Sequence, residues 1–152
     1  MKIHHVCLIV KNIDESLKLY RDILGFKPDI DMIIPDAEGA FFNQKTLDDI
    51  FHVKGAKSRM VIARSKEGTV IEFQQPMVPD VQSVPKEQLQ YGYTGFHELA
   101  FTVDDINAWY DKIKAAGYEM QTEYTWEVRG IVKSFLFYDV DGNMVQMCKP
   151  LQ

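Results

Sequence analysis

The stretch Val10-Lys11-Asn12-Ile13 decides the fold, because Val103-Asp104-Asp105-Ile106 repeats its pattern in the second half of the chain. Each copy follows a short apolar segment, which is typical of a buried strand. Each also places a polar residue of the kind that caps helices directly before an apolar stripe at helical spacing. The repeat therefore predicts two similar modules, and it constrains the fold more than any single motif does.

The pattern continues outward from both copies in the same order. Each half is predicted to form a strand, a helix and three further strands, which is a βαβββ module. In the first half the expected strands cover residues 3–10, 26–34, 59–63 and 69–74, with a helix near 13–24 and a loop-like segment at 35–49. In the second half they cover residues 96–103, 118–124, 131–138 and 143–149, with a helix near 105–116.

The stretch between the two patterns contains several prolines and glycines and predicts a linker. The expected division is a first module at residues 1–75, a linker at 76–95 and a second module at 96–152, which together build one domain. Each module has one sheet face covered by its helix and a second face that needs a partner. The expected fold class is α+β, with two βαβββ modules forming a curved, mostly antiparallel sheet around a cup and the helices outside.

Composition and charge argue against several classes of partner. The hydrophobic fraction is 46%, the charged fraction 26% and the net charge -5, all ordinary for a globular domain. The sequence shows no basic stripe, which argues against nucleic acid or an anionic membrane as a partner. It also shows no signal-like or membrane-spanning apolar run, so a cytoplasmic protein is expected. Cys7 and Cys148 lie in apolar runs and are predicted to be buried free thiols.

Four motifs together resemble a known superfamily. They are His5-Val6-Cys7-Leu8-Ile9-Val10-Lys11-Asn12-Ile13, Leu24-Gly25-Phe26, Ala100-Phe101-Thr102-Val103-Asp104-Asp105-Ile106 and Asp139-Val140-Asp141-Gly142-Asn143. The chain resembles the vicinal-oxygen-chelate superfamily, which includes glyoxalase I, bleomycin-resistance proteins and extradiol dioxygenases. The resemblance implies paired βαβββ modules, a homodimer and a divalent metal held from the first and last strand of each module.

The resemblance carries four ligand positions over to this sequence. His5 and Glu98 take the first-strand positions, since each stands at the same spacing before the isoleucine that opens its module's helix. The last-strand positions fall on Glu72 and on Gln146, where the family usually has glutamate. The predicted metal ligands are therefore His5, Glu72, Glu98 and Gln146, and the expected cofactor is zinc, nickel, manganese or iron.

Strand alternation supports Glu98 over its neighbour His97 as the second-module ligand. With the alternate residues turned toward the helix, His5 and Cys7 face the cup in one module, and Glu98 and Ala100 in the other. His97 then points away, unless a β-bulge shifts the register.

Glu72 and Glu98 are isolated acids in strongly apolar strands. A charge there needs a cation or a dense set of hydrogen bonds, although either acid could instead face solvent. Both are the predicted catalytic residues, because a carboxylate that leaves the metal can move a proton between adjacent carbons. Gln146 cannot act as a base, and Glu72 holds the more certain motif position.

Three functions remain open, all with a small-molecule ligand. The first is a metal-dependent lyase or isomerase of the glyoxalase type, acting on a hydroxy-carbonyl or enolisable substrate through a metal-stabilised enolate. The second is a metal-free binding or resistance protein of the bleomycin-resistance kind. The third is an iron-dependent extradiol-type dioxygenase, which requires His97 beside His5 and Glu72.

The first module is also longer between its two ligand positions than the second. The excess falls at residues 35–57, which are predicted to be an insertion that borders the cup. The cup itself is built either within one chain or across a dimer.

Overall fold

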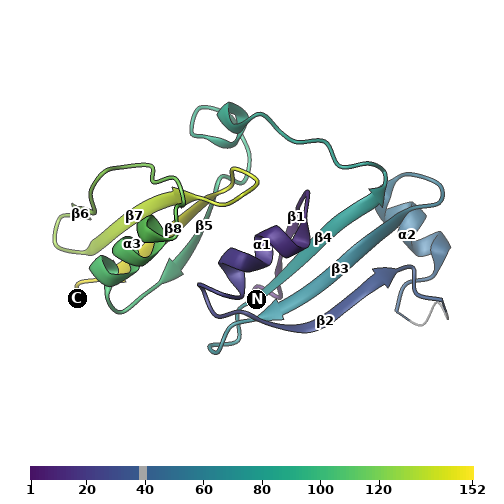
Figure 1. Ribbon diagram of the computed structural model, residues 1–152, viewed down its shortest axis with the longest axis horizontal. Helices are drawn as coiled ribbons and strands as arrows, with labels where there is room; N and C mark the ends of the chain where they lie inside the picture. Colours follow the sequence, from purple (N-terminus) through teal and green to yellow (C-terminus); the bar gives the residue numbers. More distant parts are fainter. Residues whose placement is uncertain (38–40) are drawn as a thin grey trace. The chain divides into compact units, whose positions relative to one another are not determined.

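The computed structural model describes residues 1–37 and 41–152, and the chain divides into two compact units, Met1–Ser83 and Val84–Gln152. Within the described residues, each unit has its own four-stranded sheet of parallel and antiparallel pairs (Figure 1). The predicted α+β class and the repeated βαβββ order are both confirmed.

The first unit builds its sheet around β4. Its elements are β1 (Val6–Ile9), α1 (Ile13–Tyr20), β2 (Lys27–Ile34), α2 (Gln44–Phe51), β3 (Lys57–Arg64) and β4 (Val70–Val78). The strand order is β1-β4-β3-β2. β1 runs parallel to β4, whereas the β2/β3 and β3/β4 pairs are antiparallel.

The second unit repeats this order. After a short 3₁₀ helix at Lys86–Leu89 it forms β5 (Glu98–Thr102), α3 (Ile106–Ala115), β6 (Trp126–Val128), β7 (Val132–Tyr138) and β8 (Met144–Pro150). The strand order is β5-β8-β7-β6, with β5 parallel to β8. The pairs β1/β4 and β5/β8 are therefore equivalent.

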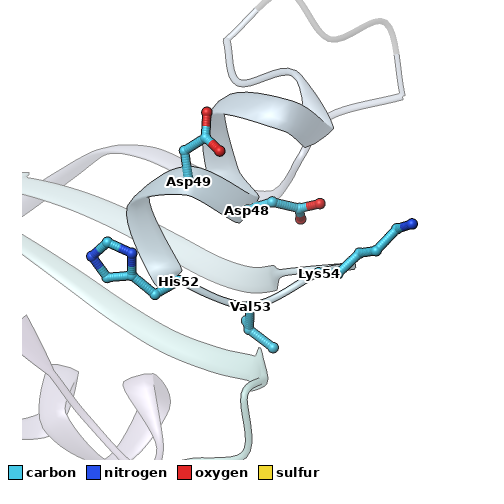
Figure 2. Close-up of a pocket in the computed structure, with 5 residues that line it drawn as sticks. All are labelled: Asp48, Asp49, His52, Val53 and Lys54. Atoms are coloured by element: carbon cyan, nitrogen blue, oxygen red, sulfur yellow. The ribbon is translucent and has the colours of Figure 1, made fainter.

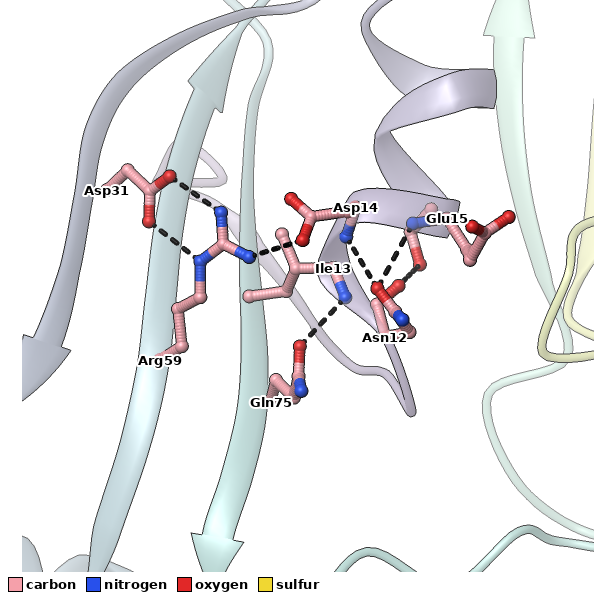
Figure 3. Close-up of polar contacts among 8 residues, drawn as sticks. Asn12, Ile13, Asp14, Glu15, Asp31, Arg59 and Gln75 are labelled. Atoms are coloured by element: carbon pink, nitrogen blue, oxygen red, sulfur yellow. Dashed lines mark hydrogen bonds and ion pairs between the residues drawn. The ribbon is translucent and has the colours of Figure 1, made fainter.

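Helix α1 begins where the sequence predicts, because Asn12 caps it. The Asn12 side chain accepts hydrogen bonds from the backbone N–H groups of Asp14 and Glu15 at 2.9 and 3.2 Å. Gln75 of β4 accepts from the N–H of Ile13 at 3.0 Å, which joins the helix start to the sheet (Figure 3).

Arg59 of β3 links the sheet to helix α1 on the face where Gln75 lies. Its guanidinium donates to Asp31 of β2 at 2.9 and 2.8 Å and to Asp14 of α1 at 2.9 Å (Figure 3). The Tyr20 ring of α1 packs edge-on to Phe73 of β4, with ring centroids 5.1 Å apart. Helix α1 thus covers one face of the first sheet.

Helix α3 covers the second sheet in the same way. Asp105 is its N-cap and accepts from the N–H of Ala108 at 3.0 Å. Tyr110 packs edge-on to Phe135 of β7, with ring centroids 5.3 Å apart.

Among the described residues, no helix has both the length and the apolar character needed to cross a membrane.

Two predicted elements are wrong. The loop-like segment 35–49 contains most of α2, whose start is capped by Asn43; residues 38–40 lie outside the described part. The spacing of Leu47 and Phe51 is helical, but the stripe is too short to stand out in the sequence. The strand expected at 118–124 lies at Trp126–Val128 instead, and Met120 makes only an isolated bridge.

Helix α2 packs on the sheet face opposite α1. Its Leu47 is buried against Ile34 of β2 and Met60 of β3. Met60 lies on the other side of β3 from Arg59, because side chains alternate along a strand. Helix α2 therefore lies against β2 and β3 on the face that α1 leaves open.

Candidate metal and substrate site

The sheet face opposite α1 carries the predicted ligand Glu72. The register pairs Glu72 of β4 with Cys7 of β1, and Gln74 with both Ile9 and Met60. Alternate residues of a strand share a face, so these side chains lie together. We call this surface the Glu72 face, and it consists of Cys7, Ile9, Met60, Glu72 and Gln74.

His5 and Glu72 come together at this face. Nε2 of His5 lies 3.6 Å from Oε2 of Glu72. That separation is too long for a hydrogen bond. It is close to the distance of about 3.4 Å between two ligands of one tetrahedral cation with metal–ligand bonds of about 2.1 Å. The side chains are 37% and 20% exposed, so an ion could reach both from solvent.

The other oxygen of Glu72 is held from within the sheet. Gln74 donates through Nε2 to Oε1 of Glu72 at 2.8 Å, and Sγ of Cys7 lies 3.8 Å from the same oxygen. The hydroxyl of Ser58 donates to Oε1 of Gln74 at 2.6 Å. Gln74 and Ser58 are buried, so this chain of hydrogen bonds is shielded from water.

Cys7 is a free, exposed residue, whereas the sequence predicts a buried thiol. The difference arises because β1 is an edge strand of the sheet. Partial desolvation of the sulfur, reinforced by the charge of Glu72, raises the pKa of the Cys7 thiol to about 12. Cys148 is free as predicted, but only half-buried.

The second sheet places Gln146 at the position equivalent to Glu72. Gln146 of β8 pairs with Ala100 of β5, as Glu72 of β4 pairs with Cys7 of β1. By alternation, Glu98 lies on the same face of β5 as Ala100. The registers of the two units therefore agree, residue for residue, along these strand pairs.

The amide of Gln146 has a defined direction. Its Nε2 donates to the hydroxyl of Ser134 at 2.9 Å, and that hydroxyl donates to the carbonyl oxygen of Met147 at 2.6 Å. Since the single hydroxyl proton is committed to Met147, Ser134 can only accept from the amide. Oε1 of Gln146 therefore points away from Ser134 and is the atom that can serve an ion or a substrate.

Glu98 and His97 both contact the segment that precedes β5. The hydroxyl of Tyr91 donates to Oε2 of Glu98 at 2.5 Å, and this bond, with some desolvation, raises the pKa of Tyr91 to about 12. The ring nitrogens of His97 contact backbone carbonyl oxygens instead, those of Leu89, at 3.1 Å, and of Tyr93. The two neighbours thus have different environments.

Of the four predicted ligands, His5 and Glu72 meet in the first unit, while Glu98 and Gln146 lie in the second. Within residues 1–37 and 41–152, three or more histidine, cysteine, aspartate or glutamate side chains do not gather in a metal-binding group. Binding of one ion by all four side chains remains a prediction.

Sequence reasoning missed the polar residues that hold these side chains, namely Ser58, Gln74, Tyr91 and Ser134. Alternation alone could have found Gln74, because it returns to the same face of the strand as Glu72. The two serines come from neighbouring strands and Tyr91 comes from the expected linker, so finding them requires the register of the sheets.

An open depression lies at the end of α2 (Figure 2). Its lining residues are Asp48, Asp49, His52, Val53 and Lys54. Asp48 already accepts from Gln44 at 2.7 Å and from the N–H of Ala56 at 2.9 Å, and Asp49 is paired with Lys45 at 2.6 Å. The two aspartates of this depression therefore stabilise α2 and the turn that follows it.

Residues 2–147 match the family model of the Glyoxalase/Bleomycin resistance protein/Dioxygenase superfamily. The metallothiol transferase FosB of Staphylococcus haemolyticus (strain JCSC1435) is 26% identical over 147 residues, covering 95% of this chain and 81% of FosB. A glyoxalase family protein from Bacillus cereus has a TM-score of 0.81 at 13% identity, covering 100% of this chain and 95% of that one. A variant of the fosfomycin resistance protein FosX from Listeria monocytogenes, complexed with Mn(II) and 1S,2S-dihydroxypropylphosphonic acid, has a TM-score of 0.61 at 17% identity, covering 96% and 87%. The two structures share the fold with this chain.

Proposed function

The chain belongs to the Glyoxalase/Bleomycin resistance protein/Dioxygenase superfamily, and we propose that it is a metal-dependent lyase or isomerase acting on a small hydroxy-carbonyl or otherwise enolisable substrate. The observation that carries the proposal is the approach of His5 and Glu72 to 3.6 Å, a separation suited to two ligands of one ion. Glu98 and Gln146 are the further ligands we propose, from the same chain or from a partner copy.

The donor set suits a divalent cation. It offers one imidazole nitrogen with carboxylate and amide oxygens, a mixture that zinc, nickel, manganese and iron accept. When bound, the cation would supply a Lewis acid for a substrate oxygen. Mn(II) accompanies the FosX variant, which supports manganese as the first ion to test.

Glu72 is the base we propose. Gln74 holds its Oε1, while Oε2 lies toward His5. A carboxylate in this setting can take a proton from the carbon next to a carbonyl and return it to the neighbouring carbon. Glu98 is the second candidate base, whereas the amide of Gln146 can only orient or accept.

The arginines of the first sheet favour a neutral substrate. Arg59 is bound to Asp31 and Asp14 beneath α1, and Arg64 is bound to Asp29 at 3.0 Å. Arg59 thus lies on the face away from Glu72, whereas Arg64 shares the face of Glu72 by alternation but is already paired with a carboxylate. A neutral hydroxy-carbonyl compound fits those surroundings better than a phosphonate or a carboxylate-bearing thiol.

Exchange of a substrate's carbon-bound hydrogens with D₂O tests the proposal. The protein, loaded with each of the four metals, is incubated in D₂O with a panel of α-hydroxy ketones and aldehydes, and NMR follows deuterium incorporation. We expect metal-dependent exchange that Glu72→Gln lowers about 100-fold or more. Exchange that needs no metal, or that survives Glu72→Gln, would refute this function.

A metal-free binding protein is the second candidate. Tyr91 and Ser134 already bond Glu98 and Gln146, so neither of those side chains requires a cation. Elemental analysis after loading separates the two candidates, because only the enzyme retains a stoichiometric ion through desalting.

Two other reactions should be tested with the same metal-loaded protein. Dioxygenase chemistry needs His97 at iron, and the contacts of both its ring nitrogens with backbone carbonyl oxygens disfavour that role. FosX is named as a fosfomycin resistance protein, and FosB is named as a metallothiol transferase. Loss of free thiol from added cysteine in the presence of fosfomycin would detect that activity here.

We also propose a cytoplasmic homodimer. Within the described sheets, β1 and β5 are edge strands, and such edges are open to pairing or coverage by a second copy. The two free cysteines fit a reducing compartment. Light scattering at micromolar concentration should give the mass of a dimer, and the mass of a monomer would refute this assembly.

A further inference from the structure

Gln74 is an amide buried in a largely apolar part of the first sheet. It is 5% exposed, and its partners across the sheet are Ile9 and Met60. Burying an amide costs free energy unless its polar atoms find partners. Gln74 finds them in Ser58, at 2.6 Å, and in Glu72, at 2.8 Å.

The direction of this chain follows from chemistry. An ionised carboxylate can only accept, so Gln74 presents its NH₂ group to Glu72. The carbonyl oxygen of Gln74 then faces Ser58, whose hydroxyl must donate to it. The order Ser58 to Gln74 to Glu72 therefore does not depend on how the two ends of the amide are assigned.

We propose that Gln74 is a positioning residue for Glu72, and that Ser58 fixes the amide of Gln74. This inference rests on the proposed metal-dependent function. With Oε1 of Glu72 held by Gln74, the carboxylate keeps its other oxygen directed toward His5, 3.6 Å away. An arriving cation then meets two ligands that are already oriented.

A purely structural role is the competing explanation, and Gln75 provides a matched control for it. The same residue type stands next along β4, on the opposite face. Oε1 of Gln75 accepts from the N–H of Ile13 at 3.0 Å and so supports the start of α1 (Figure 3). Gln74→Met and Gln75→Met each replace an amide with an apolar side chain of similar volume, and only the first of them touches Glu72.

The experiment measures two quantities on the full chain of each variant. One is the Kd for Mn²⁺ by electron paramagnetic resonance, and the other is the urea midpoint of the metal-free protein. We expect Gln74→Met to weaken Mn²⁺ binding about 10- to 100-fold. Its urea midpoint should stay level or rise, because the Ser58 hydroxyl also reaches the carbonyl oxygen of Arg59 at 3.0 Å and solvent reaches Glu72.

The control should behave in the opposite way. Gln75→Met should lower the urea midpoint and leave the Kd within about twofold, as expected for a site on another face. The visible spectrum of bound Co²⁺ should shift in Gln74→Met and stay unchanged in Gln75→Met. Ser58→Ala should weaken Mn²⁺ less than Gln74→Met does, because the amide still reaches Glu72.

The possible failures are distinguishable. If Gln74→Met keeps the wild-type Kd while Glu72→Gln loses Mn²⁺, the positioning role is wrong and the proposed function stands. If the wild-type protein binds neither Mn²⁺ nor Co²⁺, both are wrong. Should Gln74→Met fail to fold, Ser58→Ala carries the test, and an unchanged Kd in that variant overturns the inference.

Discussion

At the scale of single residues, Cys7 combines exposure with a high pKa. Desolvation and then the Glu72 carboxylate raise the pKa of the thiol to about 12, so little thiolate is present at pH 8. We expect Cys7 in the metal-free protein to react with iodoacetamide at pH 8 at least ~10-fold more slowly than cysteine in a model peptide. The rate should still be rising with pH at pH 10.

The substitution Glu72→Gln separates the two causes. It removes the charge of Glu72 but leaves the desolvation of the sulfur, which is the larger cause. Alkylation of Cys7, followed by peptide mass spectrometry, should therefore become faster without reaching the rate of the model peptide. A wild-type rate equal to that of the peptide would contradict this description of the Glu72 face.

Part of the candidate site is predictable from the sequence through its resemblance to the superfamily. The resemblance assigns Glu72 and Gln146 to equivalent last-strand positions, and the registers of the two sheets agree with that equivalence. The exposure of Cys7 depends on its place in an edge strand. The partnership of Ser58 with Gln74 depends on which strands are neighbours, and neither fact is local in the sequence.

At the scale of elements, α2 should be an integral part of the first unit. Leu47 is 1% exposed and packs with Ile34, Ala56 and Met60. Leu47→Ala should cost about 2–4 kcal/mol in the free energy of unfolding. Lys45→Ala, on the exposed side of the same helix, should cost no more than about 0.5 kcal/mol. Equal, small losses in urea unfolding of both variants would mean that α2 is not packed on the sheet.

The Arg59 ion pairs join β2, β3 and α1. They predict that the free energy of unfolding decreases when the pH falls below about 4. Hydrogen bonding to Arg59 lowers the pKa of Asp31. A lowered folded-state pKa adds stability above the unfolded pKa of about 4, and this contribution is lost as the pH falls through the folded value. Arg59→Met should therefore cost about 0.5–1 kcal/mol at pH 7, since the pair is partly exposed.

The same variant should lose less stability than the wild type between pH 4 and pH 2. Urea midpoints measured across that range check the expectation, with Arg64→Met as a control at a more exposed pair, to Asp29. Parallel curves for Arg59→Met and the wild type would show that the pair does not contribute to folding.

Elements with a cap and an apolar stripe are predictable from this sequence, and the others are not. Helix α1 begins at the predicted cap Asn12, and helix α3 begins at Asp105, one of the two possible caps, Asp104 and Asp105, that the sequence predicts. Helix α2 is stabilised by burial of Leu47 against two strands rather than by a long stripe of its own. Strand β6 spans only Trp126–Val128, which is too short for alternation to reveal it.

At the scale of the whole molecule, the internal repeat carries most of the information. It predicts the βαβββ order of both units and the equivalence of the ligand positions, whereas the parallel pairing of the first and last strands comes from the structure. It does not identify the reaction, because Gln146 stands where the resemblance leads one to expect glutamate. We propose that His5, Glu72, Glu98 and Gln146 bind one divalent ion.

Anomalous diffraction from a crystal soaked in Mn²⁺ tests that claim most directly. We predict one peak within about 2.0–2.3 Å of Nε2 of His5, a carboxylate oxygen of each of Glu72 and Glu98, and Oε1 of Gln146. That peak should vanish in Glu72→Gln and persist in His97→Ala. A peak at His97 in place of Glu98, or soaked crystals with no peak at Glu72, would contradict the claim.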